Sequence, residues 1–203
     1  MKFEELMDTH YLFLLEKIQE QSQHKKPFIL AIDGMCGSGK TTLATYLSKK
    51  LNASVIHMDD FFLPPILKTP TRLSEIGGNI HYERFQQEVL VYINNDTDFS
   101  YKAYDCHTLT YLKEVFIKKT PILIIEGSYS LHPIFKTYYD MSIYMCVSAE
   151  EQLQRIFARC AKPELQKRFQ EEWIPMENAY CNAYKLKETC AFCLDTTNLI
   201  LRP

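Results

Sequence analysis

The stretch that decides the fold is Gly34-Met35-Cys36-Gly37-Ser38-Gly39-Lys40-Thr41-Thr42, which reads as a Gly-x-x-x-x-Gly-Lys-Thr loop. The apolar residues 28–32 precede it and are few enough to form a buried strand. Residues 43–51 follow it and carry apolar side chains at helical spacing. A strand, a glycine-rich loop and a helix in this order are the context in which the pattern binds phosphate groups. The alternative, a glycine turn with a chance lysine, does not account for both flanks.

Each residue type in this loop suits a triphosphate ligand. Gly34, Gly37 and Gly39 let backbone N–H groups approach the phosphates closely. The helix that begins near Lys40 adds the partial positive charge of its N-terminus. We expect Lys40 to reach the β- and γ-phosphates and Thr41 to offer its hydroxyl to Mg²⁺. The predicted nucleotide-binding residues are Gly34, Met35, Cys36, Gly37, Ser38, Gly39, Lys40, Thr41 and Thr42.

Length and composition fit a single α/β domain spanning residues 1–203. Of these residues, 46% are hydrophobic and 24% are charged, which is ordinary for a globular protein. The net charge of −2 gives no field that favours nucleic acid or a membrane surface. No apolar run reaches transmembrane length, and the acidic start at residues 1–5 is unlike a signal peptide. Seven cysteines, an odd number, favour reduced thiols, so we expect a cytoplasmic protein.

Strand and helix patterns alternate along the chain, which predicts a parallel sheet with helices on both faces. Residues 1–26 form an N-terminal helical extension. The long segment 63–80 is rich in proline and glycine, and such loops are more often functional than idle. The expected elements are a helix at 3–20, strands at 54–58, 122–127, 142–147 and 192–195, an extension of the last strand at 199–201, helices at 81–94, 149–160 and 162–184, and a hairpin or extended excursion at 101–111.

Two acids follow predicted strands and would complete a site beside the loop. Asp59 and Glu126 both fall at carboxyl ends of strands, where ligands bind in open parallel sheets. Phosphoryl transfer needs a positioned hydroxyl and Mg²⁺. We therefore expect Asp59 to orient and deprotonate an acceptor hydroxyl and Glu126 to hold Mg²⁺, with Asp60 sharing either duty. The alternative is that these acids cap helices, which is common at strand ends.

Arginines in the region 150–184 predict a lid over the site. Arg155 and Arg159 are four residues apart and would share one helix face, and Arg168 lies in the next helical segment. A small kinase must exclude water, and a mobile arginine-bearing lid does so while neutralising charge in the transition state. A solvated charged helix is the alternative interpretation.

Taken together, these features resemble the uridine kinase and phosphoribulokinase group of P-loop kinases over roughly residues 28–184. The resemblance implies a three-layer P-loop kinase fold with a helical lid. It implies ATP and Mg²⁺ as cofactors and phosphoryl transfer to a hydroxyl of a small molecule, first of all a nucleoside. It also identifies Asp59 with the catalytic aspartate of the family. The matching segments are Gly34–Thr42, His57–Phe62, Tyr104-Asp105, Ile124–Gly127 and the arginines after residue 150.

The acceptor side departs from the family pattern. Uridine kinases have an Asn-Phe-Asp-His-Pro type stretch whose aspartate holds ribose hydroxyls, whereas Asn79-Ile80-His81-Tyr82 has His81 in that place. Cys106 stands where the family has an aromatic residue, and His107 follows it. Tyrosine offers a stacking face with a hydroxyl, and arginine offers a fork for anionic groups. The candidate acceptor contacts are Arg72, His81, Tyr82, Arg84 and Tyr104.

The acceptor and the assembly stay open at this stage. Pantothenate, nicotinamide riboside and a phosphorylated sugar are alternative acceptors, and a phosphate acceptor would not need a base such as Asp59. A non-catalytic ATP-binding switch is the alternative of another class. A GTPase would need an Asn-Lys-x-Asp type tetrapeptide, which the chain lacks. The expected partner is a small-molecule acceptor, and homo-oligomerisation is left open.

Overall fold

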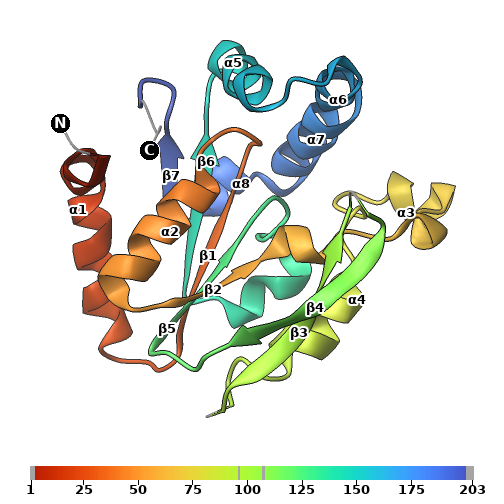
Figure 1. Ribbon diagram of the computed structural model, residues 1–203. Coiled ribbons are helices and arrows are strands. Elements are labelled where there is room, and N and C mark those ends of the chain that lie inside the picture. Colours follow the sequence, from red (N-terminus) through yellow and green to blue (C-terminus); the bar gives the residue numbers. More distant parts are fainter. Residues whose placement is uncertain (1–2, 96, 107, 200–203) are drawn as a thin grey trace.

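A computed structural model describes residues 3–95, 97–106 and 108–199 and has a parallel five-stranded sheet at its centre (Figure 1). The strand order is β2-β5-β1-β6-β7, and every pairing is parallel. The phosphate loop follows β1, which is the middle strand of the sheet. The two neighbours of β1 are β5 and β6, which come later in the chain. The strands are β1 (Phe28–Gly34), β2 (Ser54–His57), β5 (Ile122–Glu126), β6 (Met141–Cys146) and β7 (Phe192–Asp195).

Two hydrophobic cores lie on opposite faces of this sheet, because side chains alternate along each strand. Ile29 joins one core, whereas Leu30 and Ile32 join the other. The Leu30 face is covered by α1 and α2, and the Ile29 face by α4, α7, α8 and the hairpin β3–β4. The three-layer α/β prediction is therefore confirmed. The further elements are α1 (Phe3–Ser22), α2 (Lys40–Leu51), α3 (Pro70–Ser74), α4 (Tyr82–Phe85), β3 (Phe99–Asp105), β4 (Thr110–Ile117), α5 (Ala149–Arg159), α6 (Pro163–Arg168), α7 (Ile174–Tyr184) and α8 (Leu186–Thr189).

Three expected segments take more detailed forms. The helix expected at 81–94 is α4, which continues as a π-helical turn at Gln86–Leu90. The excursion at 101–111 is the antiparallel hairpin β3–β4. The expected strand at 199–201 falls partly outside the described residues, since 200 and 201 are not among them, and neither is His107.

The helical segment after β6 runs through α6, a π-helical turn at Phe169–Trp173, and α7. Pro163 and Pro175 both lie in the first turn of a helix, where a missing N–H group breaks no helical hydrogen bond. In Figure 1 this segment lies above the carboxyl ends of the strands. No helix in the described ranges is both long and apolar enough to cross a membrane.

Candidate active site

The phosphate loop leaves β1 through a glycine that no other residue could replace. Gly34 has φ of 148°, and a Cβ atom there would lie 2.1 Å from the carbonyl oxygen of Met145 on β6. The loop then returns to begin α2 at Lys40. The Lys40 ammonium donates to the carbonyl oxygens of Gly34 (2.7 Å) and Met35 (3.1 Å). The lysine side chain therefore folds back onto its own loop.

Side chains from distant elements hold the outer face of this loop through its carbonyl oxygens. Gln152 Nε2 donates to Cys36 O (2.9 Å), and Thr196 Oγ1 donates to Ser38 O (2.9 Å). Arg155 Nη1 donates to Gly37 O at 3.2 Å. These bonds engage three successive carbonyl oxygens, those of residues 36–38, on the outer face of the loop. The backbone N–H groups of the loop can then face a bound anion, as they do in backbone anion sites.

Arg155 is placed differently from the expected lid arginine. Nε donates to Glu151, Nη1 to Gly37 O and Thr196 Oγ1, and Nη2 to the carbonyl oxygens of Thr196 and Leu199. A guanidinium has five N–H donors, so each finds an acceptor here. Arg155 therefore ties the phosphate loop to the segment after β7 and has no donor left for a phosphate. Arg159, the other lid candidate, is exposed and lies 5.9 Å from the ring of Phe169.

We expect Arg155→Lys to lower the free energy of unfolding by about 2–3 kcal/mol, because lysine keeps the charge but cannot satisfy these acceptors. The looser loop should also raise the KM for ATP several-fold. Chemical denaturation and steady-state kinetics measure the two effects. Arg168→Lys is the matched control, since Arg168 is exposed and its ion pair is with Glu172; that change should stay within about 0.5 kcal/mol. Equal stability of the two variants would contradict the bracing role.

Two buried carboxylates behind the loop were not anticipated from the sequence. Asp33, directly before Gly34, accepts from the N–H groups of Gly34, Tyr129 and Leu131 and from the Tyr180 hydroxyl. Burial raises the pKa of Asp33 to about 6, against these bonds and Lys40. The position of Asp33 at the end of a predicted strand is the sequence feature that could have identified it as a site residue.

Glu177 of α7 is the second of these carboxylates. It accepts from Cys36 N (2.7 Å) and Ser128 Oγ (2.6 Å), so it links the helix after the lid region to the phosphate loop. No local pattern in the sequence marks this long-range contact.

Asp59 lies where the sequence predicts, beside the end of β5. A Cβ atom on Gly127 would be 3.3 Å from Asp59 Oδ1, so the two segments are in direct contact. The Asp59 side chain is exposed at this edge, yet crowding by protein raises its pKa to about 6. Lys40 opposes that rise, and the carboxylates of Glu126, Glu177 and Asp60 add to it. Asp59 is therefore within electrostatic reach of both the loop lysine and Glu126.

Glu126 is the second strand-end acid, and it faces the start of α2. The Thr41 hydroxyl lies 3.3 and 3.4 Å from its two carboxylate oxygens, and His57 Nδ1 lies 2.5 Å from Oε1. Asp60 is turned elsewhere, since its Oδ2 accepts from the Tyr101 hydroxyl at 2.7 Å. The structure therefore brings Thr41 and Glu126 together and directs one oxygen of Asp60 toward β3.

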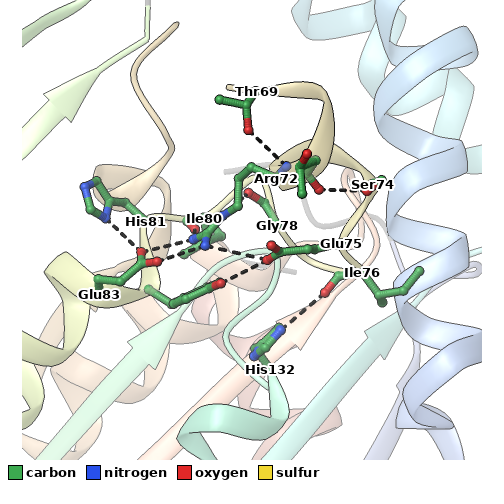
Figure 2. A network of polar contacts seen from close by, with 12 residues as sticks. Thr69, Arg72, Ser74, Glu75, Ile76, Gly78, Ile80, His81, Glu83 and His132 are labelled. Atoms are coloured by element: carbon green, nitrogen blue, oxygen red, sulfur yellow. Dashed lines mark hydrogen bonds and ion pairs between the residues drawn. The ribbon is translucent and has the colours of Figure 1, made fainter. Parts of the chain in front are cut away.

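Three of the acceptor candidates meet in one network around Glu83 (Figure 2). The Arg72 guanidinium makes two bonds to the Glu83 carboxylate, at 2.8 and 3.0 Å, and lies 3.6 Å from the ring of Tyr82. His81 Nδ1 lies 3.1 Å from Glu83 Oε2. Backbone pairing of His81 with Phe61 joins this network to the segment that carries Asp59. Glu83, which sequence reasoning missed, is the centre of the group.

The other two candidates lie at the hairpin, Arg84 packed against it and Tyr104 within β3. Arg84 is buried, donates to the carbonyl oxygens of Asp60 (2.8 Å) and Lys102 (2.7 Å), and stacks on Phe61. Tyr104 is buried, and its hydroxyl has no hydrogen-bond partner within the part of the chain that the structure describes. Arg84 therefore holds the hairpin to the Asp59 turn, and the Tyr104 hydroxyl is a donor available to a ligand that reaches it.

Comparison with known proteins gives the family. Nicotinamide riboside kinase 1 of Homo sapiens is 34% identical over 147 residues, which is 68% of each chain. The chain belongs to the nicotinamide riboside kinase family. The Rattus norvegicus enzyme of the same name is 31% identical over 148 residues, 68% of this chain and 69% of its own. No protein-family profile matches the chain.

The solved structures agree with this family at the level of the fold. A possible uridine kinase from Bacillus stearothermophilus superposes with a TM-score of 0.64 at 20% identity, over 90% of this chain and 99% of its own. Membership in the nicotinamide riboside kinase family makes the chain an ATP-dependent small-molecule kinase of the uridine kinase-like P-loop group. The predictions of family, fold and enzyme class are thereby confirmed.

Proposed function

We propose that the chain transfers the γ-phosphoryl group of ATP to a ribose hydroxyl of a nucleoside, with nicotinamide riboside as its acceptor. The observation that carries this proposal is Asp59, an accessible carboxylate that contacts Gly127 at the carboxyl edge of the sheet and whose pKa responds to the charges of Lys40 and Glu126. The name of the human relative supports the choice of acceptor. Residues 1–203 act as one kinase domain in this proposal.

The donor half of the site is the loop Gly34–Thr42. Its N–H groups bind the triphosphate, and Lys40 leaves the carbonyl oxygens of Gly34 and Met35 to contact the β- and γ-phosphates. Arg159, the last residue of α5, neutralises charge on the transferred phosphoryl group. Arg155 contributes by holding the loop, because its donors are already engaged.

The residues around Glu126 fit Mg²⁺. Carboxylate and hydroxyl oxygens are ligands that Mg²⁺ prefers, and it is commonly bound by one or two carboxylates plus substrate phosphates. In the described residues, no group of three or more His, Cys, Asp or Glu side chains could hold a metal alone, which suits that arrangement. Thr41 and Glu126 would hold the ion, with Asp60 as a further ligand if it leaves Tyr101. The bound ion would supply charge neutralisation at the phosphates.

Asp59 acts on the acceptor hydroxyl. It accepts a hydrogen bond from that hydroxyl, orients it toward the γ-phosphate and takes its proton as the oxygen–phosphorus bond forms. A pKa near 6 keeps Asp59 largely ionised at neutral pH while making it a better base than an ordinary aspartate.

Charge on the acceptor side favours a cationic nucleoside over a phosphorylated sugar. Nicotinamide riboside carries a pyridinium cation, and Asp59 is an accessible carboxylate in this region. Glu83 is accessible as well, and its charge is paired with Arg72. Arg72 is engaged with Glu83 and with the carbonyl oxygens of Gly78 and Ile80, so it is not free to receive a phosphate. Arg84 is buried, and its Nη2 holds two backbone carbonyl oxygens. We propose that Glu83, two residues after His81, supplies the acid that holds ribose hydroxyls, and that Tyr82 and Tyr104 contribute aromatic or hydroxyl contacts.

A coupled ADP-release assay tests the function. We expect ADP release that requires Mg²⁺ and an added acceptor, with kcat/KM for nicotinamide riboside at least tenfold above those for uridine, pantothenate and a sugar phosphate. Mass spectrometry of the product should show one added phosphoryl group. ATP consumption that does not depend on any of these acceptors would contradict the proposal, and ATP binding without turnover would favour a non-catalytic switch.

A further inference from the structure

His57 is a side chain of this site whose role the reaction above does not use. It ends β2, and the strand register pairs it directly with Glu126 on β5. Its Nδ1 lies 2.5 Å from Glu126 Oε1, the shortest polar contact that Glu126 makes among the described residues. The His57 side chain is 45% exposed, whereas the Glu126 side chain is 5% exposed. His57 therefore covers a buried carboxylate from the solvent side.

The contacts of Glu126 show what this placement does. Thr41, at the start of α2, approaches both carboxylate oxygens at 3.3 and 3.4 Å, and His57 approaches Oε1 from the neighbouring strand. The two donors come from elements on different sides of Glu126, so together they fix the rotation of its carboxylate. Without His57, one oxygen would lose its strongest partner beside the acids Asp59 and Asp60, which lie two and three residues further along the chain.

We propose that His57 is a positioning residue that fixes the Glu126 carboxylate through an Nδ1–H hydrogen bond and so presents Glu126 and Thr41 together to the Mg²⁺ of the bound nucleotide. The inference rests on the proposed role of Glu126. Hydrogen bonds from groups behind a metal ligand orient that ligand, and removing such a group commonly weakens metal affinity about 10- to 100-fold. His57 Nδ1 is directed at the Glu126 carboxylate, so this nitrogen acts on Glu126 and not on the ion.

The geometry supplies a matched set of variants. In His57→Asn the side-chain amide nitrogen can stand near the position of Nδ1, whereas in His57→Gln it stands nearer the position of Nε2. His57→Ala removes the donor altogether. Only the asparagine variant should therefore keep the bond to Glu126. His24→Ala, a change of an exposed histidine outside the site, is the control.

Metal binding is measured directly, with Mn²⁺ as the probe, by electron paramagnetic resonance in the presence of a non-hydrolysable ATP analogue. Isothermal titration of the analogue without metal and the thermal midpoint of the ligand-free protein are recorded alongside. We expect His57→Ala and His57→Gln to weaken Mn²⁺ binding about 10-fold or more and to raise the Mg²⁺ concentration for half-maximal activity equally. Binding of the analogue without metal, and turnover at saturating Mg²⁺, should change little. His57→Asn and His24→Ala should stay within about threefold of the natural chain.

Glu126→Gln separates failure of this inference from failure of the proposed function. If Glu126→Gln weakens Mn²⁺ binding and His57→Ala does not, the positioning role is overturned while the metal role of Glu126 stands. If Glu126→Gln leaves Mn²⁺ binding unchanged, the proposed metal site itself is wrong. In the Glu126→Gln background the further change His57→Ala should have no added effect. An asparagine variant as impaired as the alanine variant would also overturn the proposal, because it would show that the Nδ1 position is not what matters.

Discussion

Asp59→Asn should lower kcat for phosphorylation of a hydroxyl acceptor by about 10²- to 10⁴-fold, the range that general bases contribute. Asparagine keeps the size of the side chain but cannot take the hydroxyl proton. Binding of an ATP analogue should stay within a few-fold of the natural chain, because Asp59 lies on the acceptor side of Lys40. Steady-state kinetics and calorimetric titration of the analogue measure the two quantities.

The pH dependence of the natural chain gives a second readout of the same carboxylate. Crowding by the surrounding protein raises the pKa of Asp59 to about 6, from an ordinary value of 3.8. A base must be ionised to act, so kcat should fall as the pH is lowered through about 6 and should be level above it.

Asp98→Asn is the matched control. Asp98 is an exposed acid directly before β3, and an asparagine there can still accept a hydrogen bond from the backbone N–H of Lys119. It should leave kcat and its pH dependence unchanged. Near-normal turnover of Asp59→Asn would remove Asp59 as the base. It would then favour a phosphate acceptor, which is already ionised.

The donor half of the site could be predicted because its chemistry is local in sequence. The loop from Gly34 to Thr42 combines glycines, a lysine and a hydroxyl in a spacing that one strand–loop–helix geometry explains. Asp59 and Glu126 follow from a rule about where parallel strands end. Pairing of β2 with β5 then brings the two acids to one edge, as expected.

The roles of individual arginines could not be predicted in the same way. Helical spacing places Arg155 on a face of α5 but cannot say that this face meets Thr196, 41 residues further on. The same spacing predicts one role for Arg155 and Arg159, whereas the structure holds the first, half-buried, in a hydrogen-bond network and leaves the second exposed. A contact of long sequence separation leaves no local pattern.

The acceptor side shows a related difficulty. The family motif has its acid at the position of His81, whereas the carboxylate that organises this segment is Glu83, which pairs with Arg72 (Figure 2). The sequence position of Arg84 suits an acceptor contact, whereas in the structure Arg84 is buried and donates to Asp60 O and Lys102 O. Here tertiary contacts decide which polar side chains are left for a ligand.

Lys40→Met should lower kcat/KM for ATP by about 10³-fold, because the lysine neutralises charge that grows on the phosphates in the transition state. Methionine keeps the aliphatic stem and removes only the ammonium. The ligand-free protein loses the two bonds to Gly34 O and Met35 O, so a modest fall in its thermal midpoint is expected as well.

The lysine also lowers the pKa of Asp59, so the acidic limb of the residual activity should move to higher pH in Lys40→Met. Lys49→Met, a change of an exposed lysine in the same helix, should leave kcat/KM within about twofold and the limb in place. If the acidic limb of the pH–activity profile stays near pH 6 in Lys40→Met, the charge of Lys40 does not affect the pKa of Asp59. Turnover within tenfold of the natural chain at saturating ATP would show that the γ-phosphate does not depend on this lysine. If the acidic limb moves to higher pH and kcat also falls, Lys40 and Asp59 act on the same reacting group. A lysine that only anchored the nucleotide would change KM and leave the pH dependence of kcat unchanged.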